Sequence, residues 1–212
     1  SAFDEFQDSR FKTGVGAEAS LTLFGQPWYG DAIGTTLFYP SSDGELWKSD
    51  GVTATRVRDL RPTSTTHSLH SSVVRMGPRV YFAADDGVSG LELWSSDGTS
   101  AGTTLVADIV PGSGAALVEG ITILVKLWAT STKLFFFART GVGTELWVSD
   151  GTAAGTHLVG DLTPGGDTFT ATSELVVFQD QVFFSGGDGE LWKSDGTTAG
   201  TVQVKALLPG TS

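Results

Sequence analysis

The chain has 212 residues and a formal net charge of −11 at pH 7, and it contains no cysteine. The excess of acidic residues argues against nucleic acid and against an anionic membrane surface as partners, because phosphate binding requires a basic face. The lack of cysteine excludes a disulfide framework and thiol chemistry. No apolar run approaches the roughly 18 residues that span a bilayer, so no insertion into a membrane is expected.

Residues 1–19 are expected to form an amino-terminal arm, and residues 20–212 a single domain. Phe3, Phe6 and Phe11 lie in the arm among acidic and basic residues. Large apolar rings in an otherwise polar segment favour an arm that docks on a partner.

Four units of similar sequence follow the arm, at about residues 20–62, 69–112, 119–165 and 173–210. Each unit is expected to contain four short strands, because β-branched and aromatic runs alternate with Gly, Pro, Asp and Ser. No apolar residues recur at helical spacing behind a cap. The first two strands of the units are expected at Leu21–Phe24 and Thr35–Tyr39, Ser72–Met76 and Arg79–Ala84, Ile121–Leu127 and Lys133–Ala138, and Glu174–Phe178 and Gln181–Ser185.

The third expected strand of each unit carries a repeated motif, Glu-Leu-Trp-x-Ser-Asp-Gly. Its glutamates are 47, 53 and 45 residues apart, a spacing that suits one four-stranded propeller blade. A second shared phrase, Gly-Thr-x-Ala-Gly-Thr, begins at Gly98, Gly151 and Gly196 and leads into the fourth strand. The first unit departs from this phrase, with Val52 and Ala54 where the threonine and the second glycine are expected.

These features predict an all-β fold, a β-propeller of four four-stranded antiparallel blades. The connections are too short for parallel crossovers, so the strands must run up and down within each unit. Radial packing of the sheets buries their faces and leaves only short edges. A flat β-solenoid and a pair of sandwiches are the alternatives, and the four units also fit a segment of a larger propeller.

The repeated motif resembles that of the ELWxxDGT-repeat proteins, and the resemblance covers roughly residues 20–210. It implies a tandem-repeat, propeller-like protein of a kind common among secreted and surface chains. We therefore expect a secreted or extracellular protein, or one in an organelle lumen. The family has no general catalytic activity to carry over. The eroded first unit and Ala206, which replaces an aspartate of the other units, depart from its pattern.

The residues of the repeat are interpreted as structural. A tryptophan at the same place in every unit suits the gap between adjacent blades, and a ring of sugar-stacking platforms is the alternative. Aspartate followed by glycine suits a turn, and the motif glutamate is expected to be a buried hydrogen-bond acceptor. The structural residues are Trp47, Trp94, Trp147 and Trp192 together with Asp50, Asp97, Asp150 and Asp195.

Aromatic residues outside the repeat are the candidate partner-binding residues. Trp28 and Tyr29 fall in the long connection Gly25–Gly34 of unit one, and Trp128 falls in the corresponding connection of unit three. These connections share one face of an up-and-down blade with the loops after the motif. In a ring of four blades, units one and three are opposite each other. Aromatic side chains that project there would form a docking surface, unless they fold back and plug the ring.

No cofactor is expected. Asp85 and Asp86 are weak candidates for a cation such as calcium, which needs about six to eight oxygen ligands. His67, His70 and His157 offer too few ligands for zinc. No nucleophile or phosphate-binding motif has its required context, and a glycosidase would need two carboxylates converging in a pocket.

The sequence therefore predicts a non-enzymatic binding or scaffold module that engages a protein partner. A peripheral subunit of a larger assembly is a concrete form of this prediction. The alternative is a propeller lectin that binds glycans in equivalent pockets of each blade.

Overall fold

The computed structural model describes residues 19–23, 26–62, 66–117, 125–162, 174–186 and 190–205. Every regular element within these ranges is a β-strand, and none of the described residues belongs to a helix that could cross a bilayer. The strands of each sheet pair in chain order and antiparallel. The all-β fold of antiparallel sheets predicted from the sequence is thus confirmed.

Four sheets follow one another along the chain. The first contains β1 (Ala19–Leu23), β2 (Gln26–Ile33), β3 (Thr36–Pro40), β4 (Leu46–Ser49) and β5 (Ala54–Arg58). The second contains β6 (Val74–Met76), β7 (Arg79–Asp85), β8 (Leu91–Ser96) and β9 (Thr104–Ala107). The third contains β10 (Leu127–Ala129), β11 (Leu134–Thr140), β12 (Gly143–Ser149) and β13 (His157–Leu158), and the fourth β14 (Val176–Phe178), β15 (Gln181–Ser185), β16 (Leu191–Ser194) and β17 (Val202–Lys205).

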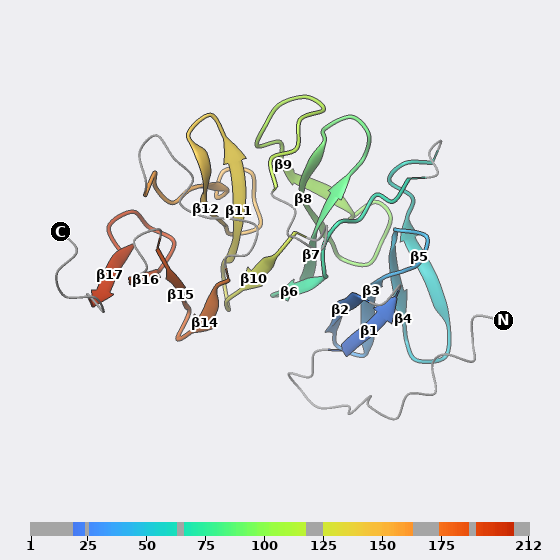
Figure 1. The fold of residues 1–212 in the computed structure, drawn as a ribbon. Helices are drawn as coiled ribbons and strands as arrows, with labels where there is room; N and C mark the ends of the chain where they lie inside the picture. Colours follow the sequence, from blue (N-terminus) through green and yellow to red (C-terminus); the bar gives the residue numbers. More distant parts are fainter. Residues whose placement is uncertain are drawn as a thin grey trace.

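The sheets are arranged like propeller blades along an open arc (Figure 1). The inner strands of successive sheets contact one another: β2 contacts β6, β6 contacts β10, and β10 contacts β14. The first and the fourth sheet lie at opposite ends of the arc (Figure 1). A closed ring of four blades, with units one and three opposite each other, does not describe this arrangement.

The hydrophobic core lies between neighbouring sheets, in three clusters. On β7, Val80 and Phe82 pack toward the first sheet, whereas Tyr81 and Ala83 pack toward the third. Successive side chains of a strand point to opposite faces, so a strand covered on both sides is apolar at every position. This geometry explains the continuous hydrophobic run over residues 80–84.

The motif strands β8 and β12 take part in interfaces on both of their faces, and β4 and β16, in the first and fourth sheets, on one face each. Trp94, Trp147 and Trp192 pack with the clusters that their sheets share with the preceding sheet. The leucine before each tryptophan points the other way. Leu46, Leu93 and Leu146 are almost fully buried against the following sheet.

The segment Gly25–Gly34, expected to be a loop, contains the strand β2, so this expectation is wrong. Trp28 and Tyr29 pair there with Leu21 and Ser20 of β1. Aromatic and β-branched residues favour strands, and Gly34, with a φ of +61°, supplies the turn into β3. The first sheet therefore has five strands rather than four.

In unit three the inner strand extends further than expected at its end. It is expected at Ile121–Leu127, of which residues 121–124 lie outside the described part, and β10 covers Leu127–Ala129 and contains Trp128. The turn that follows is closed by Thr130, whose hydroxyl accepts the N–H of Lys133 at 3.0 Å. Placing Trp128 in a loop is therefore wrong, because the turn begins only after Ala129.

The leucine of the motif provides a test of packing between sheets. Leu93→Ala removes a side chain that the third sheet covers completely, so we expect the free energy of unfolding to fall by about 2–5 kcal/mol. The matched change Leu191→Ala lies at the same repeat position in the fourth sheet, where the leucine is only half-buried. In dilute solution it should lower the free energy of unfolding much less. Urea unfolding followed by tryptophan fluorescence measures both. Equal losses would contradict the sheet-on-sheet core.

Candidate functional site

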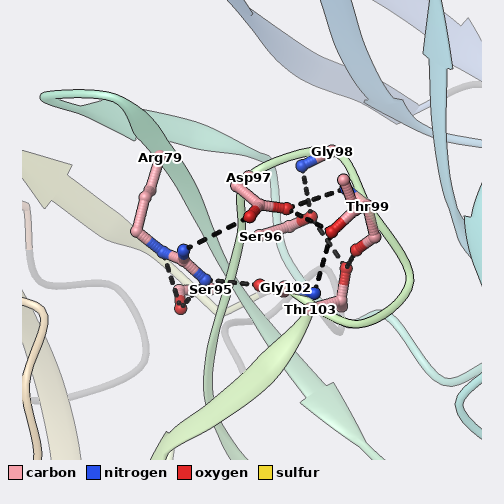
Figure 2. A network of polar contacts seen from close by, with 8 residues as sticks. All are labelled: Arg79, Ser95, Ser96, Asp97, Gly98, Thr99, Gly102 and Thr103. Carbon is pink, nitrogen blue, oxygen red and sulfur yellow. Dashed lines mark hydrogen bonds and ion pairs between the residues drawn. The ribbon is translucent and has the colours of Figure 1, made fainter.

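The loop that follows each of the last three motif strands has the same internal hydrogen bonds. We call these segments, residues 97–103, 150–156 and 195–201, the DGT loops. In the first of them, Asp97 Oδ1 accepts the N–H and the hydroxyl of Thr99, both at 2.8 Å (Figure 2). The hydroxyl oxygen of Thr99 accepts the N–H of Gly102 at 2.9 Å. The aspartate thus organises its own loop.

A second set of bonds closes the base of each DGT loop. The Thr103 hydroxyl donates to the carbonyl of Thr99 at 2.7 Å, and its oxygen lies 2.8 Å from Ser96 Oγ. Ser96 Oγ also accepts the N–H of Gly98 at 3.0 Å. The corresponding distances in the other two DGT loops are within 0.1 Å of these.

These contacts give the phrase Gly-Thr-x-Ala-Gly-Thr a physical reason. A Cβ on Gly102 would lie 2.1 Å from the carboxylate oxygens of Asp97, so the aspartate can fold over the loop only if that position is glycine. Gly155 and Gly200 meet Asp150 and Asp195 at the same distance. The recurrence of this second glycine in three units was visible in the sequence, but its role as space for the carboxylate was not recognised.

The hydrogen bonds also set the acidity of the aspartates. The hydroxyl of Thr99 and then its N–H hold the pKa of Asp97 below its ordinary value, because both stabilise the ionised form. The pKa values of Asp150 and Asp195 are lowered by the equivalent threonines. In the eroded first unit, the N–H groups of Thr53 and Val52 lower the pKa of Asp50. These carboxylates are therefore ionised and occupied with local donors.

The DGT loops are fixed to neighbouring structure as well. Lys48 donates to the carbonyl of Gly98 at 2.7 Å, and Lys133 donates to the carbonyl of Asp195. Within the second sheet, Arg79 at the start of β7 donates to the carbonyl of Gly102 and lies 3.9 Å from a carboxylate oxygen of Asp97 (Figure 2). These contacts hold the loops against neighbouring strands and turns at one end of the sheets.

The motif glutamates lie at a different place, inside the interfaces. Glu92 and Glu145 are completely buried, and Glu45 and Glu190 nearly so. The two carboxylate oxygens of Glu92 accept the N–H groups of Ile109 and Val110 at 3.2 and 3.1 Å. Glu45 accepts the N–H of Leu60 and Glu145 that of Leu162. The expectation of a buried acceptor is confirmed for these three, which hold the chain where it leaves the last strand of its sheet.

Burial dominates the acidity of Glu92. Its pKa rises to about 7 because removal from water disfavours the charged form, and the two N–H groups offset only part of this. The pKa of Glu45 is raised for the same first reason, while the Ser68 hydroxyl and the N–H of Leu60 act in the opposite direction.

An open polar pocket of about 350 Å³ lies beside Glu45, lined also by Asp43, Arg56, Asp59 and His67. The sequence did not point to it, because its residues come from separate connections. Its carboxylates have partners within the protein: Asp43 accepts the indole N–H of Trp47 at 2.9 Å, and Asp59 pairs with Arg56 at 3.1 Å. The pocket therefore offers no unpaired carboxylate among these groups.

The weak cation candidates also form local bonds. Asp85 accepts the N–H of Gly87 at 2.6 Å and pairs with Arg61, while Asp86 accepts the N–H groups of Val88 and Ser89. Within the described part of the chain, no three His, Asp or Glu side chains lie together as a metal site would need.

Of the candidate partner-binding residues, Trp128 is the one whose side chain lies in the described part of the chain. The Trp128 ring is half-buried and packs edge-on against Phe137, with ring centroids 5.3 Å apart. Trp28 and Tyr29 lie on β2, and their side chains are outside the described part. Phe3, Phe6 and Phe11 lie outside the described residues altogether. Their partner-binding role stays a prediction.

Removal of the loop aspartate tests the local network. We expect Asp150→Ala to speed amide hydrogen exchange at Thr152 and Gly155 and to cost about 1 kcal/mol of stability, as for loss of one local hydrogen-bonding group. Asp150→Asn is the matched control, because it keeps an acceptor oxygen in place. Exchange measured by NMR distinguishes them, and unchanged rates in the alanine variant would contradict the network.

Glu92 generates a prediction about pH. Its folded pKa of about 7 exceeds the unfolded value of about 4.3, so the folded state binds more protons between these values. The contribution of Glu92 to stability is therefore full below about pH 4 and is lost as the pH rises through about 7. Glu92→Gln, which cannot ionise, should flatten the dependence of the urea midpoint on pH in this window. An unaltered slope in Glu92→Gln would contradict the assignment.

Comparison with solved structures finds chains of low sequence identity with TM-scores below 0.5. No family model matches the sequence, and no curated protein matches it significantly. The computationally designed protein Ika8 is similar with a TM-score of 0.48 and 14% identity, over 82% of this chain and 47% of that one. The designed protein Ika4 gives 0.45 and 15%, over 77% and 87%, and BamB from Moraxella catarrhalis gives 0.43 and 15%, over 87% and 56%. The chain thus spans about half the length of Ika8.

Proposed function

We propose that the protein is a non-catalytic binding or scaffold module that engages a protein partner through the DGT loops. The observation that carries this proposal is the internal use of the repeated polar groups. In each loop the aspartate and the threonine two residues after it bond to each other and to the loop backbone. Further contacts reach beyond the loops, from Asp97 to Arg79 and from Thr198 to the carbonyl of Val159. The motif glutamates Glu45, Glu92 and Glu145 hold the backbone. The DGT loops therefore present a partner with a surface defined by its shape rather than by free polar groups.

The tips of the DGT loops form a repeated exposed surface. Each tip consists of three small residues that are exposed to solvent: Thr99, Ser100 and Ala101, then Thr152, Ala153 and Ala154, and finally Thr197, Thr198 and Ala199. The tips project from three successive sheets. A series of similar contacts along neighbouring blades suits an extended segment or an elongated surface of another protein.

The rigidity of the loops supports binding. Ordering a loop on association costs conformational entropy, and a loop already held by hydrogen bonds loses little more. The acidic character of the chain favours a partner with a basic surface. The compartment we propose is the one expected from the repeat, outside the cell or in an organelle lumen.

Affinity capture with surface variants tests the proposal. We expect the double variant Ala101→Arg/Ala154→Arg to keep its thermal melting temperature, since both side chains are exposed, and to lose the proteins that the wild-type chain retains from its native extract. The matched control Val88→Arg/Val142→Arg adds the same charge to exposed loops between the second and third strands of blades two and three, and should retain them.

Two outcomes would contradict this function. If the loop variant retained the same proteins as wild type, the DGT loops would not be the binding surface. If the wild-type chain bound a glycan array and the loop variant bound it equally well, a lectin with pockets elsewhere would replace the scaffold.

A further inference from the structure

Exposed hydrophobic side chains are concentrated on the fourth sheet. Of the eight large hydrophobic residues that are exposed in the described part of the chain, five lie on β14 and β17 and the other three in loops. Val176 is 64% exposed, Phe178 57% and Val204 44%. A monomeric protein rarely leaves such a group of apolar side chains open to water.

The repeat identifies what is unusual about this face. Val57, Val106 and Val159 occupy the position of Val204 in the first three sheets, and all three are buried. Met76 occupies the position of Phe178 and is 7% exposed. Phe38, Tyr81 and Phe135 correspond to Phe183, and only Phe183 is half-buried rather than buried. In the first three sheets the following sheet covers these positions.

The opposite end of the arc shows the complementary face. Val80, Leu134 and Val182 are each completely buried against the preceding sheet, whereas Leu37, which has their position in the first sheet, is half-buried.

The glycine after each loop aspartate gives an independent observation. A Cβ on Gly98 would lie 2.9 Å from the Phe38 ring of the preceding sheet, and one on Gly151 would lie 2.2 Å from the hydroxyl of Tyr81. Gly51 has the same φ of +90° but nothing within 4 Å of that position. The first sheet therefore has the same kind of face that a preceding sheet covers in the second and third sheets. Among the described residues, nothing covers this face at Gly51.

We infer that the exposed face of the fourth sheet packs on the first sheet of a second copy of this chain, head to tail. In that contact Phe183 covers Gly51 of the second copy, as Phe38 covers Gly98 within one chain. Lys193 has the repeat position of Lys48, which donates to the carbonyl of Gly98, and it meets the carbonyl of Gly51. The two exposed faces are the two halves of an interface that each chain already contains three times.

Such a contact joins two different surfaces, so it either closes into a ring or continues as a chain. Two copies are the smallest ring that covers both ends of each arc. This inference is independent of the proposed partner surface, because the DGT loops project from another side of the sheets.

Sedimentation velocity and light scattering across a concentration series test the inference. The wild-type chain should self-associate, with a dimer as the expected species. Val204→Glu, on the exposed face of the fourth sheet, should weaken association by at least about thirtyfold, as for a central interface residue. Val88→Glu places the same charge on a loop residue that is 73% exposed and should associate like wild type. A wild-type chain that stays monomeric throughout would overturn the inference.

A mixing experiment tests the head-to-tail geometry. Leu37→Glu blocks the first sheet and Val204→Glu the fourth, so each variant alone should be monomeric. Their equimolar mixture keeps one intact pair of faces and should form a 1:1 dimer, weaker than that of wild type. Circular dichroism and thermal melts verify that both variants fold, and Phe178→Asp replaces Val204→Glu if it does not. A folded mixture that remains monomeric would overturn the assignment of the two faces.

Discussion

Packing of one sheet on the next is the interaction on which the rest of this structure depends. The central strands are apolar on both faces, so a single sheet could not remain folded with either face in water. Val80 and Tyr81 are adjacent in sequence but belong to different clusters, and the same division holds for Leu134 and Phe135. The clusters thus link the sheets into one body. At the two ends of the open arc, the outermost sheet faces have no neighbouring sheet to cover them among the described residues.

The polar residues of the repeat serve this packing. Glu92 is buried in the interface and holds the backbone at Ile109 and Val110, which fixes where the chain turns toward the next sheet. Asp97 shapes a loop whose glycine touches the preceding sheet. Groups that elsewhere perform catalysis or bind metals have positioning roles in this protein. For this reason the functional proposals rest on loop tips and on exposed faces rather than on the residues that recur most clearly.

Much of the fold was accessible from the sequence, because each sheet is specified by local features. The motif strand, the aspartate-glycine turn and the order of strands follow from periodicity and turn chemistry. Two strand positions were wrong, at β2 and β10, where Gly25, Gly34 and a run of polar residues near Thr130 made strand residues look like a loop. Whether the four units close into a ring or form a segment of a larger propeller could not be decided from the sequence, since closure depends on small rotations between sheets that no local pattern encodes. The polar pocket beside Glu45 was not expected, because it brings together the connections before β4 and after β5 with Arg56 of β5, and no local pattern pairs these segments.

The pairing of every strand with its neighbour in the chain also bears on how this protein acquires its structure. Hairpins close with short loops, so the entropy lost in forming each sheet is small and the contacts are local. The strands of a blade can therefore pair soon after they emerge from the ribosome, and the blade becomes stable when the next sheet emerges and packs on it. Translation itself would set the order of assembly, from the amino-terminal sheet onward. Nascent chains of this kind are protected from wrong pairing between similar blades, because each new sheet meets a completed neighbour first.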